Sequence, residues 1–143
     1  MLCEEVMTQE VATVQPQDSV LAAARQMREL DVGFLPVVQS DGAPVGTLTD
    51  RDIVLQVVAE ERAPASTRVE QVMSSDVVTC SPEDDVRRAE ELMSAHQISR
   101  VLCVDSDGSV AGVISLGDIA EAEAERTAGR TLSDVKLEQP PTH

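Results

Sequence analysis

The sequence predicts an α/β (α+β) fold built from two tandem copies of one β-α-β-β-α unit. Shifted by 66 residues, the chain matches itself without a gap: 16 of the 48 pairs between residues 6–53 and 72–119 are identical. Apolar residues in each copy first follow a helical spacing and then form short strand-like runs. One unit alone would be only marginally stable, because a domain of about 60 residues buries little of its surface. We therefore expect the two copies to pack against each other.

Each copy is expected to begin with a short strand and a helix. The runs from Val11 to Val14 and from Val77 to Cys80 have the length and the β-branched residues of strands. A proline and an acidic residue follow each run, which is typical of a helix start. Apolar residues then recur at helical spacing: Val20, Ala23, Ala24, Met27 and Leu30 in the first copy, and Val86, Ala89, Leu92, Met93 and His96 in the second.

A hairpin and a second helix complete each copy. The dipeptides Asp41-Gly42 and Asp107-Gly108 are typical of tight turns between two strands. The unbroken apolar runs beside them indicate strands covered on both faces. The strands are expected at residues 34–38 and 45–48, and at 101–104 and 111–114, with the last helices starting near Asp50 and Leu116.

The repeat also sets the expected domain boundaries. The first motif covers residues 4–61 and the second covers 68–127, joined by a linker at 62–67 that contains Pro64. Residues 128–143 are polar and are expected to form a disordered tail.

Composition excludes several classes of partner. The formal net charge is −15 and Phe34 is the only aromatic residue, so binding of nucleic acid through phosphate neutralisation or base stacking is not expected. Anionic membrane surfaces are disfavoured for the same reason. No apolar run approaches the roughly 18 residues of a membrane span. The first five residues lack the features of a signal peptide. A cytoplasmic location is therefore expected.

No metal site and no catalytic site are expected. Cys3, Cys80 and Cys103 are widely spaced, form no CxxC pair and have no companion histidine cluster. Cys103 lies in an apolar run and is expected to be buried, whereas Cys3 and Cys80 could be exposed. No Ser/His/Asp or Cys/His set recurs in both copies, so we expect no enzyme activity.

The junction between the last strand and the last helix carries the strongest functional pattern. Both copies follow Gly-x-x-[Thr/Ser]-x-x-Asp there, with Thr49 and Asp52 in the first and Ser115 and Asp118 in the second. A helix start offers free N–H groups to a phosphate, and a carboxylate beside it can accept hydrogen bonds from two ribose hydroxyls. The same spacing is also that of a capping box. The two interpretations are compatible, because a ligand can use a capping residue.

These motifs resemble the CBS family. Gly-Thr-Leu-Thr-Asp-Arg-Asp-Ile at 46–53 and Val-Ile-Ser-Leu-Gly-Asp-Ile at 113–119 carry the resemblance, supported by the apolar runs at 32–38 and 98–104. The whole chain is similar to a stand-alone CBS pair, or Bateman module. The resemblance implies two motifs packed as a pseudo-twofold pair, with two ligand clefts between them and a homodimer as the assembly.

The resemblance also implies the residues of each cleft. In adenine nucleotide-binding members, the Asp holds the ribose, while the hydroxyl residue and a basic residue meet the phosphate. Phe34 stands where the second copy has Arg100, so the cleft with Arg100 is expected to be the better site. The stronger cleft would use Arg100, Ser115 and Asp118, with Val11, Ala12, Val32, Gly33 and Phe34 around the base; the weaker cleft would use Thr49 and Asp52, with Val77, Val78, Ile98 and Ser99.

Two functions compete at this point. One is a regulatory sensor that binds AMP, ADP, ATP, NAD or S-adenosylmethionine as a regulatory ligand, with no fixed cofactor. S-adenosylmethionine, which carries no phosphate, would tolerate the acidic chain better than ATP or AMP. The other is a ligand-free, stress-type interaction or scaffold protein that acts on an effector protein through its dimer surface.

Overall fold

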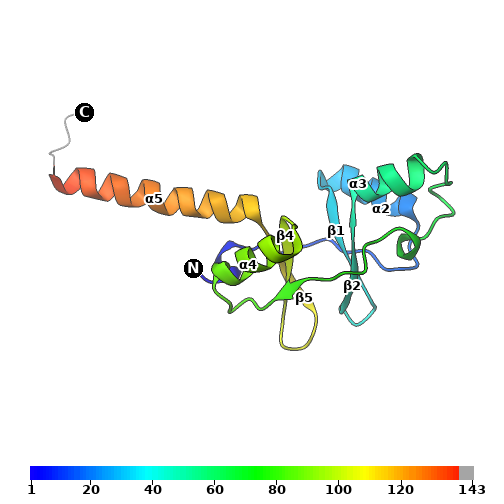
Figure 1. The fold of residues 1–143 in the computed structure, drawn as a ribbon, viewed down its shortest axis with the longest axis horizontal. Coiled ribbons are helices and arrows are strands. Elements are labelled where there is room, and N and C mark those ends of the chain that lie inside the picture. Colours follow the sequence, from blue (N-terminus) through cyan, green and yellow to red (C-terminus); the bar gives the residue numbers. More distant parts are fainter. Residues whose placement is uncertain (139–143) are drawn as a thin grey trace.

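The computed structural model describes residues 1–138, and it confirms a mixed helix and strand fold with two repeated units (Figure 1). The two hairpins stand side by side, and the last helix extends away from them. The elements in order are α1 (Cys3–Val6), α2 (Val20–Leu30), β1 (Phe34–Val38), β2 (Pro44–Thr49), α3 (Asp50–Ile53), the π-helical η1 (Val54–Val58), the 3₁₀-helical η2 (Val69–Gln71), β3 (Thr79–Cys80), α4 (Val86–His96), β4 (Arg100–Val104), β5 (Val110–Ser115) and α5 (Leu116–Glu138).

The strands form one small sheet in each half of the molecule. β1 and β2 pair antiparallel in the first half, while β3, β4 and β5 form the sheet of the second half, with β3 parallel to β4. Both hairpins carry a register shift one residue before the end of their first strand. Gly42 and Gly108 adopt φ values of +90° and +88° in the turns, which favour glycine.

The first strand of each copy is shorter than the sequence predicts. In the second copy only Thr79 and Cys80 form a strand, and in the first copy only Val14 makes a bridge, to Val37. The expected strands at 11–14 and 77–80 are therefore wrong in length. Residues 11–12 and 78 instead line clefts described below, where an extended chain without ladder partners leaves its backbone open.

The two copies exchange their first segments. Residue Cys3 of α1 packs into the core of the second half, and Val69 and Val72 after the linker pack into the core of the first half. Thr8 N–H donates to the carbonyl of Val113 at 2.9 Å, and Val113 N–H donates back at 3.1 Å. Thr47 and Ser74 form the equivalent pair in the other half. The cores therefore do not follow the sequence boundaries at 4–61 and 68–127, because each one closes only with a segment of the other copy.

Both cores are aliphatic, and the core of the second half is also rich in sulfur. Leu48 and Ile114 occupy equivalent places and have no exposed surface. Cys3, Cys80 and Cys103 are all buried free thiols, so the expectation that Cys3 and Cys80 could be exposed is wrong. Cys3 is buried because the exchanged segment that carries it packs into the core of the second half, which the sequence pattern does not reveal.

Helix α5 runs from Leu116 to Glu138, so residues 128–138 are helical and the expected disordered tail is wrong over that range. The segment is polar, but Ala, Glu, Arg and Lys have high helix propensity, so polarity alone does not indicate disorder there. Residues 139–143 of the expected tail lie outside the described residues. Within residues 1–138, no helix is both long and apolar enough to cross a membrane.

Candidate functional site

Two clefts of similar size are related by the repeat. The first has a volume of about 460 Å³ and the second about 420 Å³, within the range of small-molecule sites. Residues 66 apart take equivalent places in the two clefts, such as Ser115 and Thr49. The first cleft is lined by Thr8, Glu10, Val11, Ala12, Leu30, Asp31, Val32, Gly33, Phe34, Leu35, Arg100, Val113, Ser115 and Asp118; the second by Phe34, Thr47, Thr49, Asp52, Ser74, Asp76, Val78, His96, Gln97, Ile98, Ser99, Arg100 and Leu102.

The hydroxyl and carboxyl residues at each junction form a capping box. Ser115 Oγ accepts from Asp118 N–H at 3.0 Å, and Asp118 Oδ2 accepts from Ser115 N–H at 3.3 Å. Thr49 and Asp52 make the same pair of bonds at 3.1 and 2.9 Å. The capping interpretation is thus confirmed for both junctions. Each box uses the Oδ2 atom only, and within residues 1–138 no hydrogen bond to the Oδ1 atom of either carboxylate is formed.

Arg100 and Phe34 lie at the centre, between the two clefts. In the hairpin register Arg100 stands opposite Ser115, and Phe34 stands opposite Thr49. The Arg100 guanidinium lies over the Phe34 ring at 5.4 Å from its centroid, a cation–π contact. Both residues line both clefts. Phe34 in place of an arginine led us to expect no cation in the second cleft. The structure differs, because the Arg100 side chain reaches across the boundary between the halves and lines that cleft as well.

The structure brings together nearly all residues that the resemblance implies. All eight residues of the stronger cleft line one cavity, and five of the six residues of the weaker cleft line the other. Val77 is the exception: it is half-buried and does not line the second cleft. Whether these residues bind a ligand stays a prediction.

Several lining residues were missed by the sequence analysis. Glu10 and Asp31 add two carboxylates to the first cleft, while Asp76 and His96 take part in the second. Asp31 ends α2 in the left-handed conformation, at φ 54°, which turns the chain back into the cleft. The repeat pairs Asp31 with Gln97, which ends α4 in the same way. The repeat could therefore have predicted that Asp31 lies at a helix end, as Gln97 does, but not that its side chain lines the cleft.

The first cleft is acidic and partly apolar. Three carboxylates, from Glu10, Asp31 and Asp118, face one guanidinium in it. Leu30 and Val32 line it and are 51% and 41% exposed, so they present a partly exposed apolar wall. The second cleft has His96 in place of Leu30 and only two carboxylates. The first cleft therefore has the less polar lining and carries more negative charge than the second.

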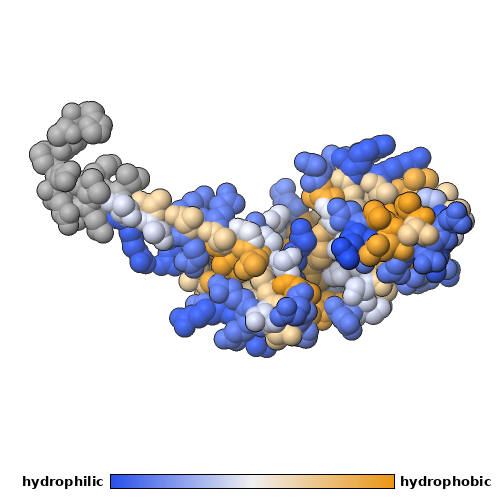
Figure 2. All heavy atoms as spheres, turned by 45° about the horizontal axis from the view of Figure 1, so that its top comes forward, coloured by the Kyte–Doolittle hydropathy of each residue, from blue (hydrophilic) through white to orange (hydrophobic). Residues whose placement is uncertain are grey.

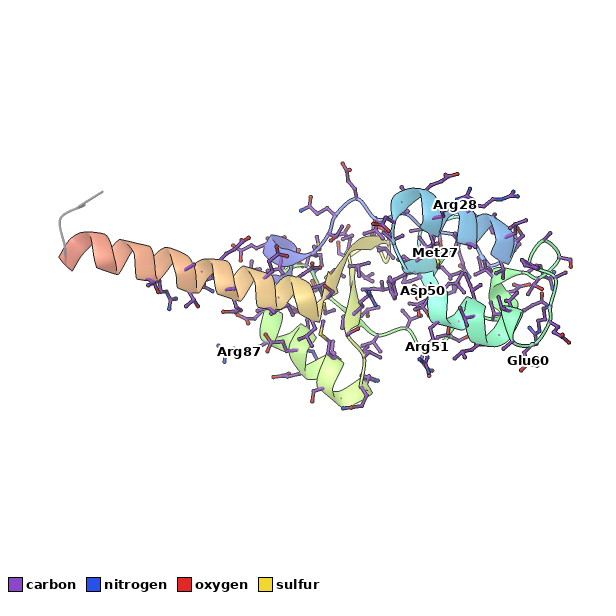
Figure 3. All side chains as sticks on the ribbon, turned by 90° about the horizontal axis from the view of Figure 1, so that it is seen from above. Met27, Arg28, Asp50, Arg51, Glu60 and Arg87 are labelled. Atoms are coloured by element: carbon purple, nitrogen blue, oxygen red, sulfur yellow. The ribbon has the colours of Figure 1, made fainter. Side chains whose placement is uncertain are left out.

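Asp50 and Arg51 start α3, at the end of the helix nearest to the other half (Figure 3). Both side chains are exposed and neither lines a cleft. Asp50 instead covers Gly33: a Cβ on that glycine would lie 2.6 Å from Asp50 Oδ2. Asp50 N–H also donates to the Gly33 carbonyl at 3.0 Å, which holds the first cleft wall against α3.

Comparison with known families and proteins agrees with the repeat. The family model described as CBS domain matches the chain twice, at residues 3–59 and 69–125. The CBS domain-containing protein YhcV of Bacillus subtilis is 38% identical over 133 residues, which cover 92% of this chain and 93% of that protein.

Solved structures show the same arrangement. The CBS domain pair of protein MJ0100, in complex with 5′-methylthioadenosine and S-adenosyl-L-methionine, has a TM-score of 0.78 and 25% identity, covering 88% of this chain and 98% of that one. The hexameric CBS-CP12 protein from bloom-forming cyanobacteria has a TM-score of 0.74 and 28% identity, covering 99% and 87%.

Proposed function

Since the chain belongs to the CBS-domain family, we propose that it is a regulatory module that binds an adenosine-containing ligand between its motifs and catalyses no reaction. One observation carries the proposal: Arg100, Ser115 and Asp118 meet an exposed apolar wall in one cleft of about 460 Å³. A cleft of that volume accommodates an adenosyl group.

The first cleft has separate places for the parts of such a ligand. Val32 and Phe34, with the backbone of Val11 and Ala12, offer an apolar surface to an adenine ring. Oδ1 of Asp118 would accept hydrogen bonds from ribose hydroxyls, while Oδ2 keeps the helix capped. The start of α5 and Arg100 lie beside it and would hold a negatively charged group.

Charge selects among adenosine-containing ligands. ATP carries several negative charges, and Glu10 and Asp31 would repel its phosphates in a cleft with one guanidinium. S-adenosylmethionine carries a sulfonium and an ammonium group, which suit these carboxylates, and a carboxylate, which suits Arg100. We therefore propose S-adenosylmethionine or a closely related adenosyl compound as the ligand, bound in the first cleft. That MJ0100 binds two such compounds supports this choice.

Thermal-shift and calorimetric titration of the purified chain tests this function. We expect saturable binding of S-adenosylmethionine and of 5′-methylthioadenosine, and weaker binding of AMP, ADP, ATP and NAD, because the cleft is acidic. No response from any of these compounds up to about 1 mM would contradict the sensor function. The ligand-free scaffold function would then remain, since the capping boxes explain Asp52 and Asp118 without a ligand.

We propose that the module assembles as a homodimer through an apolar face of α3 and η1. Val54, Leu55 and Val58 are 54%, 49% and 64% exposed there. Apolar side chains gather on the half of the molecule that holds these elements (Figure 2). A twofold dimer is the commonest assembly that would cover such a face. Self-association occurs in similar proteins, as the hexameric CBS-CP12 protein shows.

Replacing Val58 by glutamate is expected to shift the chain from dimer to monomer, because the new charge would have to be buried in the interface. Sedimentation should give twice the chain mass of 15.3 kDa for the unmodified protein and about 15.3 kDa for the variant. Gln56→Glu adds the same charge to η1 without removing an apolar side chain, and should remain dimeric. A monomeric unmodified protein would rule out the dimer.

The proposal places the module in the cytoplasm, where its three free thiols suit a reducing compartment. The ligand would act by changing how the pair or its dimer contacts an effector protein.

A further inference from the structure

All three cysteines of the chain meet at one point in the core of the second half. Cys3 comes from α1, Cys80 from the end of β3 and Cys103 from β4. Cys80 Sγ lies 3.7 Å from Cys103 Sγ and 3.9 Å from Cys3 Sγ, and the three sulfurs lie within 4.8 Å of one another. The cluster is buried, and the exchanged N-terminal segment completes it.

The first half of the molecule shows which side chains the core requires for packing at the three positions equivalent to these cysteines. Shifted by 66 residues, Cys80, Cys103 and Cys3 correspond to Val14, Val37 and Val69. These three valines are buried together in the core of the first half. A small apolar side chain therefore satisfies the fold at all three places, and packing does not explain why the second half has sulfur at every one of them.

The spacing of the sulfurs suits a common metal ion. A metal–sulfur bond of about 2.3 Å separates neighbouring ligand sulfurs by about 3.8 Å in tetrahedral geometry and about 4.0 Å in trigonal geometry. The distances of 3.7 and 3.9 Å match this range. A disulfide needs about 2.05 Å, so one pair would have to approach by about 1.7 Å and would leave the third thiol single.

We propose that Cys3, Cys80 and Cys103 form a three-thiolate site for a soft metal ion, and that the ion is Cu⁺. Thiolates select soft ions such as Cu⁺ and Zn²⁺. The cluster contains three cysteines and, within the described residues, no histidine or carboxylate as a fourth ligand. Zn²⁺ prefers four ligands, whereas Cu⁺ is satisfied by three sulfurs in a plane. The site is separate from the two clefts and does not depend on their ligand.

Binding must displace protons from the thiols. Burial and the neighbouring Cys80 raise the pKa of Cys3 to about 12. The hydrogen bond with Cys103, together with burial, also raises the pKa of Cys80. As Cu⁺–sulfur bonds form at Cys3 and Cys80, the S–H bonds break and their protons pass to solvent. Affinity should therefore increase with pH, and titration in buffers of different ionisation enthalpy should show proton release.

Competition with a chromophoric Cu⁺ chelator, under anaerobic and reducing conditions, tests the site in the full chain. We expect one equivalent of Cu⁺ per chain. Changing all three cysteines to valine copies the core of the first half, so folding should survive, which circular dichroism checks. This variant should bind Cu⁺ at least about 100-fold more weakly, since loss of even outer partners costs about 10–100-fold.

Introducing three cysteines into the first half gives a second test, which does not depend on whether the three-valine variant folds. Val14→Cys, Val37→Cys and Val69→Cys together should raise the capacity to two equivalents of Cu⁺, because they recreate the cluster in the first half. Parallel titration with Zn²⁺ should show weaker binding. Equal chelator competition by the unmodified chain and the three-valine variant would overturn the site, and tighter binding of Zn²⁺ than of Cu⁺ would overturn the assignment to Cu⁺.

Discussion

Replacing Gly112 by valine is expected to lower the free energy of unfolding by about 3 kcal/mol, in the upper range for overpacking a buried position. A Cβ on Gly112 would lie 2.7 Å from the Thr8 carbonyl oxygen and 2.7 Å from Met7 Sδ. Met7 can move, but the Thr8 carbonyl is held by the N–H of Val113. The exchanged segment must therefore lift from β5 and uncover Cys3. Urea denaturation measures the loss.

Two other glycines provide controls for this effect. Gly46 meets Met73 and Ser74 in the same way in the first half, at 2.6 and 2.7 Å, so Gly46→Val should be similarly destabilising. Gly129 lies in α5 with open space around it, and Gly129→Ala should stabilise the chain by about 0.5–1 kcal/mol. If Gly112→Val proved as stable as the unmodified chain, the exchange of segments would not be a requirement of the fold.

Replacing Asp118 by alanine is expected to weaken binding of S-adenosylmethionine by about 10-fold to 150-fold. The change removes hydrogen bonds from the ribose to a charged carboxylate, worth about 1.5–3 kcal/mol together. Asp118 lines the first cleft beside Arg100 and Ser115, whereas Asp52 lines the second. Calorimetric titration of the two variants measures the difference.

Asp52→Ala is the matched control for this substitution. Both changes remove the same kind of capping box, and each should cost about 1 kcal/mol of stability. Only Asp118→Ala should weaken binding strongly; Asp52→Ala should change it less than about 3-fold, because we propose that the ligand binds in the first cleft. Equal losses in the two variants would contradict the ranking of the clefts.

The repeat was enough to predict the fold class, the hairpins and the positions of most cleft residues. The ungapped match makes Ser115 and Asp118 equivalent to Thr49 and Asp52. The hydrogen bonds of the capping box then fix the local geometry of each pair. Such features depend on residues a few positions apart, so the sequence pattern contains them.

Features that depend on contacts between the copies could not be predicted in this way. The exchange of Cys3 and Val69 between cores has no local signal, because either copy could in principle close its own core. The contact of the Arg100 guanidinium with the Phe34 ring forms only when the two halves pack together. The cysteine cluster joins residues up to 100 positions apart. Asp31 enters the cleft through a left-handed helix end that sequence spacing does not orient.

A crystal structure of the chain grown with S-adenosylmethionine tests the central claim most directly. We expect the adenosyl group in the first cleft, with the ribose hydroxyls on Asp118 and the adenine ring against Val32 and Phe34. Density for the ligand in the second cleft alone, beside Asp52 and His96, would contradict binding in the first cleft. So would both clefts remaining empty at saturating ligand.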